Sequence, residues 1–218
     1  NRGMTTAPHS PATPATTIAT ADEVLAFWLG TARPSDAQAL AIKQQWFTKS
    51  DALDADIQAR FGATAQAALA GQLDGWGLEP WSCLALLVLL DQFTRNIYRG
   101  TPQSFAGDEK ALALARNAIA EGLDQQLPAV TRIFVYLPLE HAESLQTQAD
   151  SVAAFAQLAQ SNPAPADVHA FLAGTLDYAH RHQAVIQQFG RFPHRNAIVG
   201  RTSTADELAY LAQPGAGF

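Results

Sequence analysis

The sequence predicts an all-α protein that folds as a single domain of about eight or nine antiparallel helices. Apolar residues recur at helical spacing through most of the chain after residue 20. Two capping boxes, Thr20 to Glu23 and Thr204 to Glu207, mark helix starts near the two ends of this region. No segment shows the alternating pattern of a strand bounded by turn residues.

Residues 1–20 are rich in Ala, Thr and Pro and lack an apolar stripe. Met4 is the only methionine, so we interpret residues 1–3 as a remnant of cloning and Met4 as the natural start. A segment of this composition cannot bury enough apolar surface to fold. We therefore expect a disordered leader over 1–20, which is not a signal peptide, and a single helical domain over 21–218.

Caps, glycines and prolines predict where each helix begins and ends. Gly30, Gly71, Gly122 and Gly190 are placed to end helices, since glycine readily adopts the left-handed conformation found there. Prolines favour the first turn of a helix, where no amide hydrogen is needed. The stretch 133–137 could suit a strand, but the prolines around it favour a short helix. These signals predict helices over 20–30, 35–47, 51–71, 80–98, 107–122, 132–136, 138–161, 165–189 and 204–211.

The composition argues against several classes of protein. The chain has 14 Lys+Arg against 20 Asp+Glu, a net charge of -6, whereas nucleic-acid binding needs a basic surface. A lone cysteine, Cys83, excludes a disulfide scaffold and a cysteine-rich zinc module. The longest apolar run, Cys83–Leu90, is far shorter than the roughly 20 residues of a membrane helix. We expect a soluble, cytoplasmic protein with no membrane or nucleic-acid partner.

Three polar segments interrupt the amphipathic pattern. The first, 90–100, follows an apolar run that predicts a buried central helix. In this segment Asp91 and Arg95 lie four residues apart on one helix face, and Asn96 and Arg99 lie on an adjacent face. Charged groups at the end of a buried helix cost desolvation energy unless they are paired. The segment is therefore either an internal ion-pair network or the floor of a pocket in which arginine binds an anion.

The second polar segment, 132–146, contains Arg132 and, near the predicted start of a helix, Glu140, His141 and Glu143. Glu140 and His141 are candidates for acid–base catalysis. Carboxylates in this position could instead stabilise the helix dipole. The spacing matches neither Glu-x-x-His nor His-Glu-x-x-His, so we expect no metal.

The third polar segment, 180–201, contains an irregular stretch after Gly190 that is rich in Arg, His and Asn. Its candidate ligand-binding residues are His194, Arg195 and Asn196. Arginine presents a planar fork of donors that suits carboxylate or phosphate. The arginines of this segment could equally bond the carbonyls at helix ends, or pair with the carboxylates of the other two segments.

Taken together, the chain resembles the bacterial domain-of-unknown-function family 924. The similarity rests on FWLG (27–30), WF (46–47), LDQFTRNIYRGTPQSFAGD (90–108), PLEHAES (138–144) and FGRFPHRNAIVGR (189–201). It covers residues 21–211. The family usually has proline where this chain has Thr94, and a proline there would end the helix before Arg95. The resemblance implies a tetratricopeptide-like helical stack, and it implies no established activity, cofactor or substrate.

From the residues we expect a small-molecule site where the three polar segments meet, with an anionic ligand and no cofactor. If the protein is an enzyme, Glu140 and His141 would be its acid–base pair. The alternative is a non-enzymatic helical-repeat module that binds a peptide or protein in a groove. A third interpretation is that the segments form structural networks only. The expected ligand-binding residues are Asp91, Arg95, Asn96, Arg99, Arg132, His194, Arg195 and Asn196.

Overall fold

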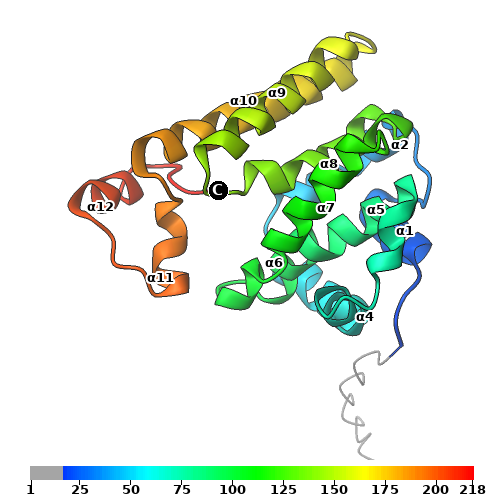
Figure 1. Ribbon diagram of the computed structural model, residues 1–218, viewed down its shortest axis with the longest axis horizontal. Helices are drawn as coiled ribbons and strands as arrows, with labels where there is room; N and C mark the ends of the chain where they lie inside the picture. Colours follow the sequence, from blue (N-terminus) through cyan, green and yellow to red (C-terminus); the bar gives the residue numbers. More distant parts are fainter. Residues whose placement is uncertain (1–16) are drawn as a thin grey trace, which may run out of the picture.

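The computed structural model describes residues 17–218, and over that range it is helical and contains no strand, which confirms the predicted all-α class. Residues 1–16 of the expected leader lie outside the described residues. Figure 1 shows α9 and α10 as a long pair along one side of the molecule. The α-helices are α1 (Ala21–Leu29), α2 (Asp36–Ala41), α3 (Gln44–Phe47), α4 (Asp51–Leu69), α5 (Pro80–Leu87), α6 (Thr94–Ile97), α7 (Asp108–Ala120), α8 (Ala129–Glu140), α9 (Leu145–Ser161), α10 (Ala166–Phe189), α11 (Asn196–Val199) and α12 (Ala205–Leu211). The shorter 3₁₀ and π-helical segments are η1 (Asp74–Leu78), η2 (Val88–Phe93), η3 (Pro102–Phe105), η4 (Asp124–Gln126) and η5 (Pro193–Arg195).

A buried helical run forms the centre of the molecule. It passes from α5 through the π-helical turn η2 into α6, and its residues from Cys83 to Leu90 are at most 1% exposed. Edge-to-face contacts of Trp28 with Phe93 and Phe134 join this run to α1 and α8. The apolar run in the sequence therefore forms the core, as predicted. Within residues 17–218, no helix is both long enough and apolar enough to cross a membrane.

The predicted capping boxes are present near both ends of the described chain. The hydroxyl of Thr20 accepts a hydrogen bond from the Glu23 amide, and the Glu23 carboxylate accepts one from the Thr20 amide. Thr204 and Glu207 form the same reciprocal pair at the start of α12. Gly190 ends α10 in the left-handed conformation, with φ of 73°. These local signals set the helix ends because they involve neighbours in the sequence.

The predicted boundary between the sixth and seventh helices is wrong. Pro138 does not begin a helix but lies inside α8. The next helix, α9, begins at Leu145 after Ser144, whose hydroxyl accepts a hydrogen bond from the Thr147 amide. A proline inside a helix removes one backbone hydrogen bond. Burial of most of α8 in the core offsets that loss, so Glu140 lies in the last turn of α8 rather than at the start of the next helix.

The C-terminal part of the described chain is more ordered than the sequence suggested. The irregular stretch expected after Gly190 contains the short helices η5 and α11. A separate difference lies near the start of the described chain, where the helix predicted over 35–47 is divided into α2 and α3. Apart from the main core there is a small distal cluster of buried Val185, Ile186 and Phe192. Figure 1 shows α11 and α12 beside one end of α10, with the chain after α12 returning to the middle of the molecule.

Candidate functional site

A pocket of about 240 Å³ opens between α7 and the corner that joins α8 to α9. The second and third polar segments line it directly. The first segment reaches it through Asp91 and Arg95, which contact lining residues. The main lining residues are Asp108, Glu109, Leu112, His141, Glu143 and Arg195.

Gly107 allows α7 to lie directly against the π-helical turn η2. A Cβ atom at this position would be 2.2 Å from the carbonyl oxygen of Leu90, so only glycine fits. This close approach brings Asp108, the first residue of α7, to Arg95. The guanidinium of Arg95 donates two hydrogen bonds to the Asp108 carboxylate, at 2.7 and 3.0 Å. Arg95 also lies 3.5 Å from Asp91, so the pairing predicted from their four-residue spacing is present.

Asp91 is enclosed by the core and holds the ring of His141. Its side chain is 1% exposed, and its Oδ1 lies 2.8 Å from His141 Nδ1. Gln92 donates a hydrogen bond of 2.7 Å to its other oxygen. Burial opposes ionisation of Asp91, but the charges of His141 and Arg95 outweigh it and keep the pKa of Asp91 below its ordinary value. An ionised, buried carboxylate therefore orients a histidine at the pocket wall.

Arg195 has looser ionic contacts than the other arginines around the pocket. Its Nη1 lies 3.6 Å from Asp108 and 4.0 Å from Glu143. Its Nη2 donates a hydrogen bond of 2.9 Å to the backbone carbonyl of His141. The guanidinium is therefore held in place mainly by a neutral acceptor, and part of its charge remains without a close counter-ion.

Aromatic rings also hold Arg195. Its guanidinium carbon lies 4.6 Å from the ring centre of Phe105 and 4.8 Å from that of Phe192. Its Nε is buried and has no hydrogen-bond partner among the described residues. Burial, together with the positive charge of Arg95, lowers the pKa of Arg195 to about 10. Arg195 remains a cation at neutral pH, in surroundings that make its charge costly.

Glu140 does not act with His141 in the pocket. It is 3% exposed, and its Oε1 lies 2.9 Å from Nδ1 of His182 in α10. The same nitrogen lies 2.8 Å from the carbonyl oxygen of Tyr178. Glu140 and His141 diverge because successive residues point in different directions around a helix. The pairing expected from the sequence is replaced by two carboxylate–histidine pairs, Asp91 with His141 and Glu140 with His182.

Asn96, Arg99 and Arg132 are among the expected ligand-binding residues that do not line the pocket. Asn96 and Arg99 both donate hydrogen bonds to Asp54 of α4, Asn96 at 2.8 Å and Arg99 at 2.6 and 3.0 Å. As predicted, they lie on the helix face next to the one that carries Asp91 and Arg95. That face meets α4 instead of α7. Arg132 donates a hydrogen bond of 2.7 Å to the carbonyl oxygen of Leu127, just before α8.

Asn196 belongs to a network that fastens the chain after α10. It is buried and donates a hydrogen bond of 2.9 Å to Glu207. Arg191 also donates to Glu207, and these hydrogen bonds lower the pKa of that carboxyl below its ordinary value. Arg201 donates two hydrogen bonds, at 2.9 and 3.1 Å, to Glu143 at the α8–α9 corner. Asn196 therefore has a structural role and does not contact the pocket.

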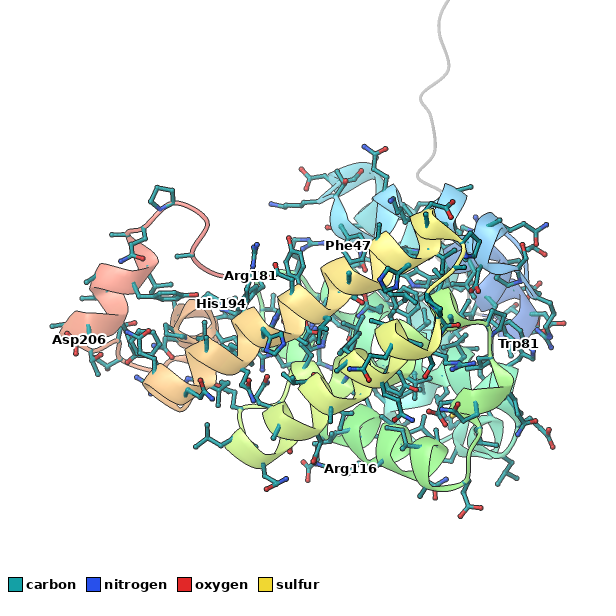
Figure 2. The ribbon with its side chains drawn as sticks, turned by 90° about the horizontal axis from the view of Figure 1, so that it is seen from above. Phe47, Trp81, Arg116, Arg181, His194 and Asp206 are labelled. Atoms are coloured by element: carbon teal, nitrogen blue, oxygen red, sulfur yellow. The ribbon has the colours of Figure 1, made fainter. Side chains whose placement is uncertain are left out.

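His194 lies beside α10, on the side to which the chain after α12 returns (Figure 2). Its Nδ1 is buried and has no hydrogen-bond partner among the described residues. Burial and the neighbouring charges of Arg195 and His182 lower the pKa of His194 to about 4. His194 is neutral at pH 7, and it is not one of the residues that line the pocket.

The sequence did not reveal the roles of Asp108 and His182. Asp108 begins a helix, where a carboxylate ordinarily stabilises the dipole, so nothing local indicated its pairing with Arg95. His182 lies inside a long amphipathic helix, and nothing local indicated its carboxylate partner. Within residues 17–218, no group of three or more His, Cys, Asp or Glu side chains is placed to hold a metal ion.

Comparison with known proteins gives a consistent family assignment. Residues 24–215 match the model of a family described as bacterial protein of unknown function (DUF924). The chain is also similar to a solved structure, that of the protein of unknown function ATU0120 from Agrobacterium tumefaciens. The sequence identity is 35%, the match covers 88% of this chain and 96% of that one, and the TM-score is 0.73. None of the curated proteins matches the chain. The resemblance noted in the sequence is confirmed, and the chain belongs to the DUF924 family.

Proposed function

We propose that the protein binds a small anionic molecule in the pocket between α7 and the α8–α9 corner, and that His141 exchanges a proton with it. The supporting observation is the 2.8 Å contact between the buried carboxylate of Asp91 and His141 Nδ1 at the pocket wall. An ionised Asp91 keeps the proton on Nδ1, which leaves Nε2 free to accept or donate one. Asp91 thus takes the partner role that the sequence suggested for Glu140.

Arg195 is the residue expected to receive the negative charge of the ligand. The carboxylates of Asp108 and Glu143 are already paired, each through two hydrogen bonds, with Arg95 and Arg201. The contacts of Arg195 with the same carboxylates are longer, at 3.6 and 4.0 Å. An anion in the pocket would give Arg195 the charge-assisted hydrogen bonds that it lacks.

Titration with inorganic phosphate, acetate and citrate, followed by NMR of the histidine side chains, tests this proposal. At least one of these anions should shift the resonances of His141. Arg195→Gln should weaken that anion's binding by about tenfold or more, because a hydrogen bond to a charged group is worth roughly 1.5–3 kcal/mol.

Arg33→Gln is the matched control, because Arg33 is about half exposed and pairs with Asp22. It should bind the anion as the unmodified protein does. Two results would contradict the proposal. One is the absence of any shift at His141 with all three anions, and the other is equal binding by the Arg195→Gln and Arg33→Gln variants.

A further inference from the structure

The ring of Phe218 lies in a box of three other rings. It stacks on His182 with a centroid separation of 3.6 Å and an angle of 17° between the planes. Phe192 meets it edge to face, with centroids 6.2 Å apart, and His194 does the same at 5.9 Å. The two edge-to-face partners have the geometry that aromatic pairs prefer, and the stacked histidine covers one face of the ring.

Phe218 itself is held weakly in this box. It remains 50% exposed, whereas His182 beneath it is 6% exposed. Among the described residues, the hydrogen bond that ties the end of this segment to another element runs from the Gly217 amide to the Tyr210 hydroxyl, at 3.3 Å. Gly215 and Gly217 have positive φ, and neither has a side chain to pack. The segment can therefore leave the box at little cost.

The box adjoins the anion pocket. Phe192 forms one side of the box and also lies against the guanidinium of Arg195, which lines the pocket. The floor of the box, His182, lies beside His141, with ring centroids 6.2 Å apart. Phe192 and His182 are thus the two residues that connect the box with Arg195 and His141, so a ligand that fills the box and reaches the pocket would have to pass along them.

The box also contains a polar group that Phe218 cannot satisfy. His194 Nδ1 is buried without a hydrogen-bond partner among the described residues, and leaving a buried polar atom unpaired costs free energy. The phenyl ring of Phe218 has neither a donor nor an acceptor to offer it. Nδ1 lies 3.9 Å from where a Cβ atom of residue 217 would be, so a polar group on a ligand that displaced Gly217 and Phe218 would supply the missing partner.

We propose that the position of the Phe218 ring is a subsite for a planar aromatic ring, and that the ligand of the pocket is an aromatic acid. This inference rests on the proposed function for the acidic end of the ligand. The aromatic end rests only on the box formed by His182, Phe192 and His194. Phe218 occupies the subsite when no ligand is bound and competes with the ligand for it.

Four probes test the proposal in the full chain. Benzoate has a ring and a carboxylate, cyclohexanecarboxylate has the carboxylate without a planar ring, acetate has the carboxylate with no ring at all, and benzyl alcohol has the aromatic ring without the charge. Binding is followed by the NMR resonances of the His182 ring. Phe218→Ala should bind benzoate roughly three- to tenfold more tightly than the unmodified protein, the factor expected for removal of one competing aromatic contact. Cyclohexanecarboxylate and acetate should gain no affinity.

Leu208→Ala is the control, because Leu208 is 58% exposed and lies in α12, before the segment that carries Phe218. It should bind benzoate as the unmodified protein does. If Phe218→Ala folds poorly, Phe218→Leu replaces it in the test. This variant keeps apolar contact with the box but loses the planar ring, so it too should bind benzoate more tightly than the unmodified protein. An equal gain for cyclohexanecarboxylate, or no gain for benzoate in either Phe218 variant, would overturn the proposal.

The two ends of the proposed ligand can be tested separately. If benzyl alcohol shifts His182 in Phe218→Ala and Arg195→Gln leaves benzoate affinity unchanged, the ring subsite is supported and the proposed anion site is wrong. If phosphate shifts His141 in an Arg195-dependent way while none of the aromatic probes shifts His182, the anion site is supported and the ring subsite is wrong.

Discussion

Most of the charged residues around the pocket are paired within a single cluster, to which the exposed Glu109 does not belong. Asp91 and Asp108 share Arg95, and Glu143 pairs with Arg201. Such a cluster is tolerated in a core only because each charge has a counter-charge and hydrogen bonds. Arg195 is the member with the longest contacts, and for that reason a ligand can gain most by binding there.

The enclosed carboxylate of Asp91 should be the most sensitive member of this cluster. Asp91→Ala should lower the free energy of unfolding by about 3–5 kcal/mol, because Arg95 and His141 would lose a buried counter-charge. Asp22→Ala, which removes an exposed ion pair with Arg33, should cost less than about 1 kcal/mol. Urea denaturation followed by circular dichroism compares the two. Losses of similar size would show that Asp91 is not enclosed as described.

His194 should make stability depend on pH in the mildly acidic range. Its pKa is about 4 in the folded protein against 6.5 for an ordinary histidine, so between these values the unfolded chain binds more protons. The free energy of unfolding should therefore fall as the pH decreases from 6.5 towards 4, by at most about 1.4 kcal/mol per pH unit from this residue.

His194→Gln removes this titration, so its stability should fall less steeply with decreasing pH. Denaturation midpoints near pH 7, 6 and 5 make the comparison. Asp91 and Glu207 have lowered pKa values, so their stabilising effect is present above about pH 4–5 and is lost only at lower pH. If the stability of His194→Gln and that of the unmodified protein fell equally with decreasing pH, the prediction would be contradicted.

At the scale of elements, helix ends follow local signals while helix packing does not. The Thr20 and Thr204 caps could be recognised directly because each cap and its partner lie three residues apart. The π-helical turn η2 has no such signature. Its Leu90 carbonyl accepts a hydrogen bond of 2.9 Å from the Thr94 hydroxyl and also faces Gly107 of another element. Only the packed structure shows that these residues meet.

The approach of α7 to η2 should make Gly107 intolerant of a side chain. Gly107→Ala should destabilise the protein by about 1–3 kcal/mol or more, because the new methyl group would overlap the Leu90 carbonyl. Backbone strain is not the cause, since Gly107 has φ of -89°. At Gly174 in α10, an added methyl group would meet no atom within 4 Å, so Gly174→Ala should stabilise by about 0.5–1 kcal/mol. Melting temperatures of Gly107→Ala and Gly174→Ala that shift in the same direction would contradict this account.

At the scale of the whole molecule, the pocket lies where the main core meets the chain that follows α10. The distal cluster of Val185, Ile186 and Phe192 is small, so residues 191–211 depend on polar contacts with the α8–α9 corner. Regions with few buried apolar contacts open more readily than the core. We therefore expect residues 191–211 to be the more mobile side of the pocket.

Hydrogen exchange measured by mass spectrometry tests this expectation. Amides of 191–211 should exchange faster than those of α5. Glu143→Gln should accelerate exchange in 191–211 by about tenfold, because it weakens charge-assisted hydrogen bonds worth roughly 1.5–3 kcal/mol to the corner. The exposed Glu121→Gln is the control and should change neither region. An equal acceleration in α5 would mean that the molecule opens as one unit.

Several conclusions were already available from the amino-acid order. Helical periodicity, the caps at Thr20 and Thr204, and the apolar run 83–90 predicted the fold class and the buried centre, because these signals act between near neighbours. The motif strings also indicated the family. Pro138 shows the limit of such reasoning, since the burial of α8 outweighed a local signal for a helix start.

The tertiary structure decided which polar side chains meet. Asp91 and His141 are 50 residues apart in the chain, and Arg99 and Asp54 are 45 apart. No local pattern encodes such contacts, because the direction of a side chain is set by its helix while its partner is set by how the helices pack. That packing separated Glu140 from His141 and brought Asp91 to the histidine instead.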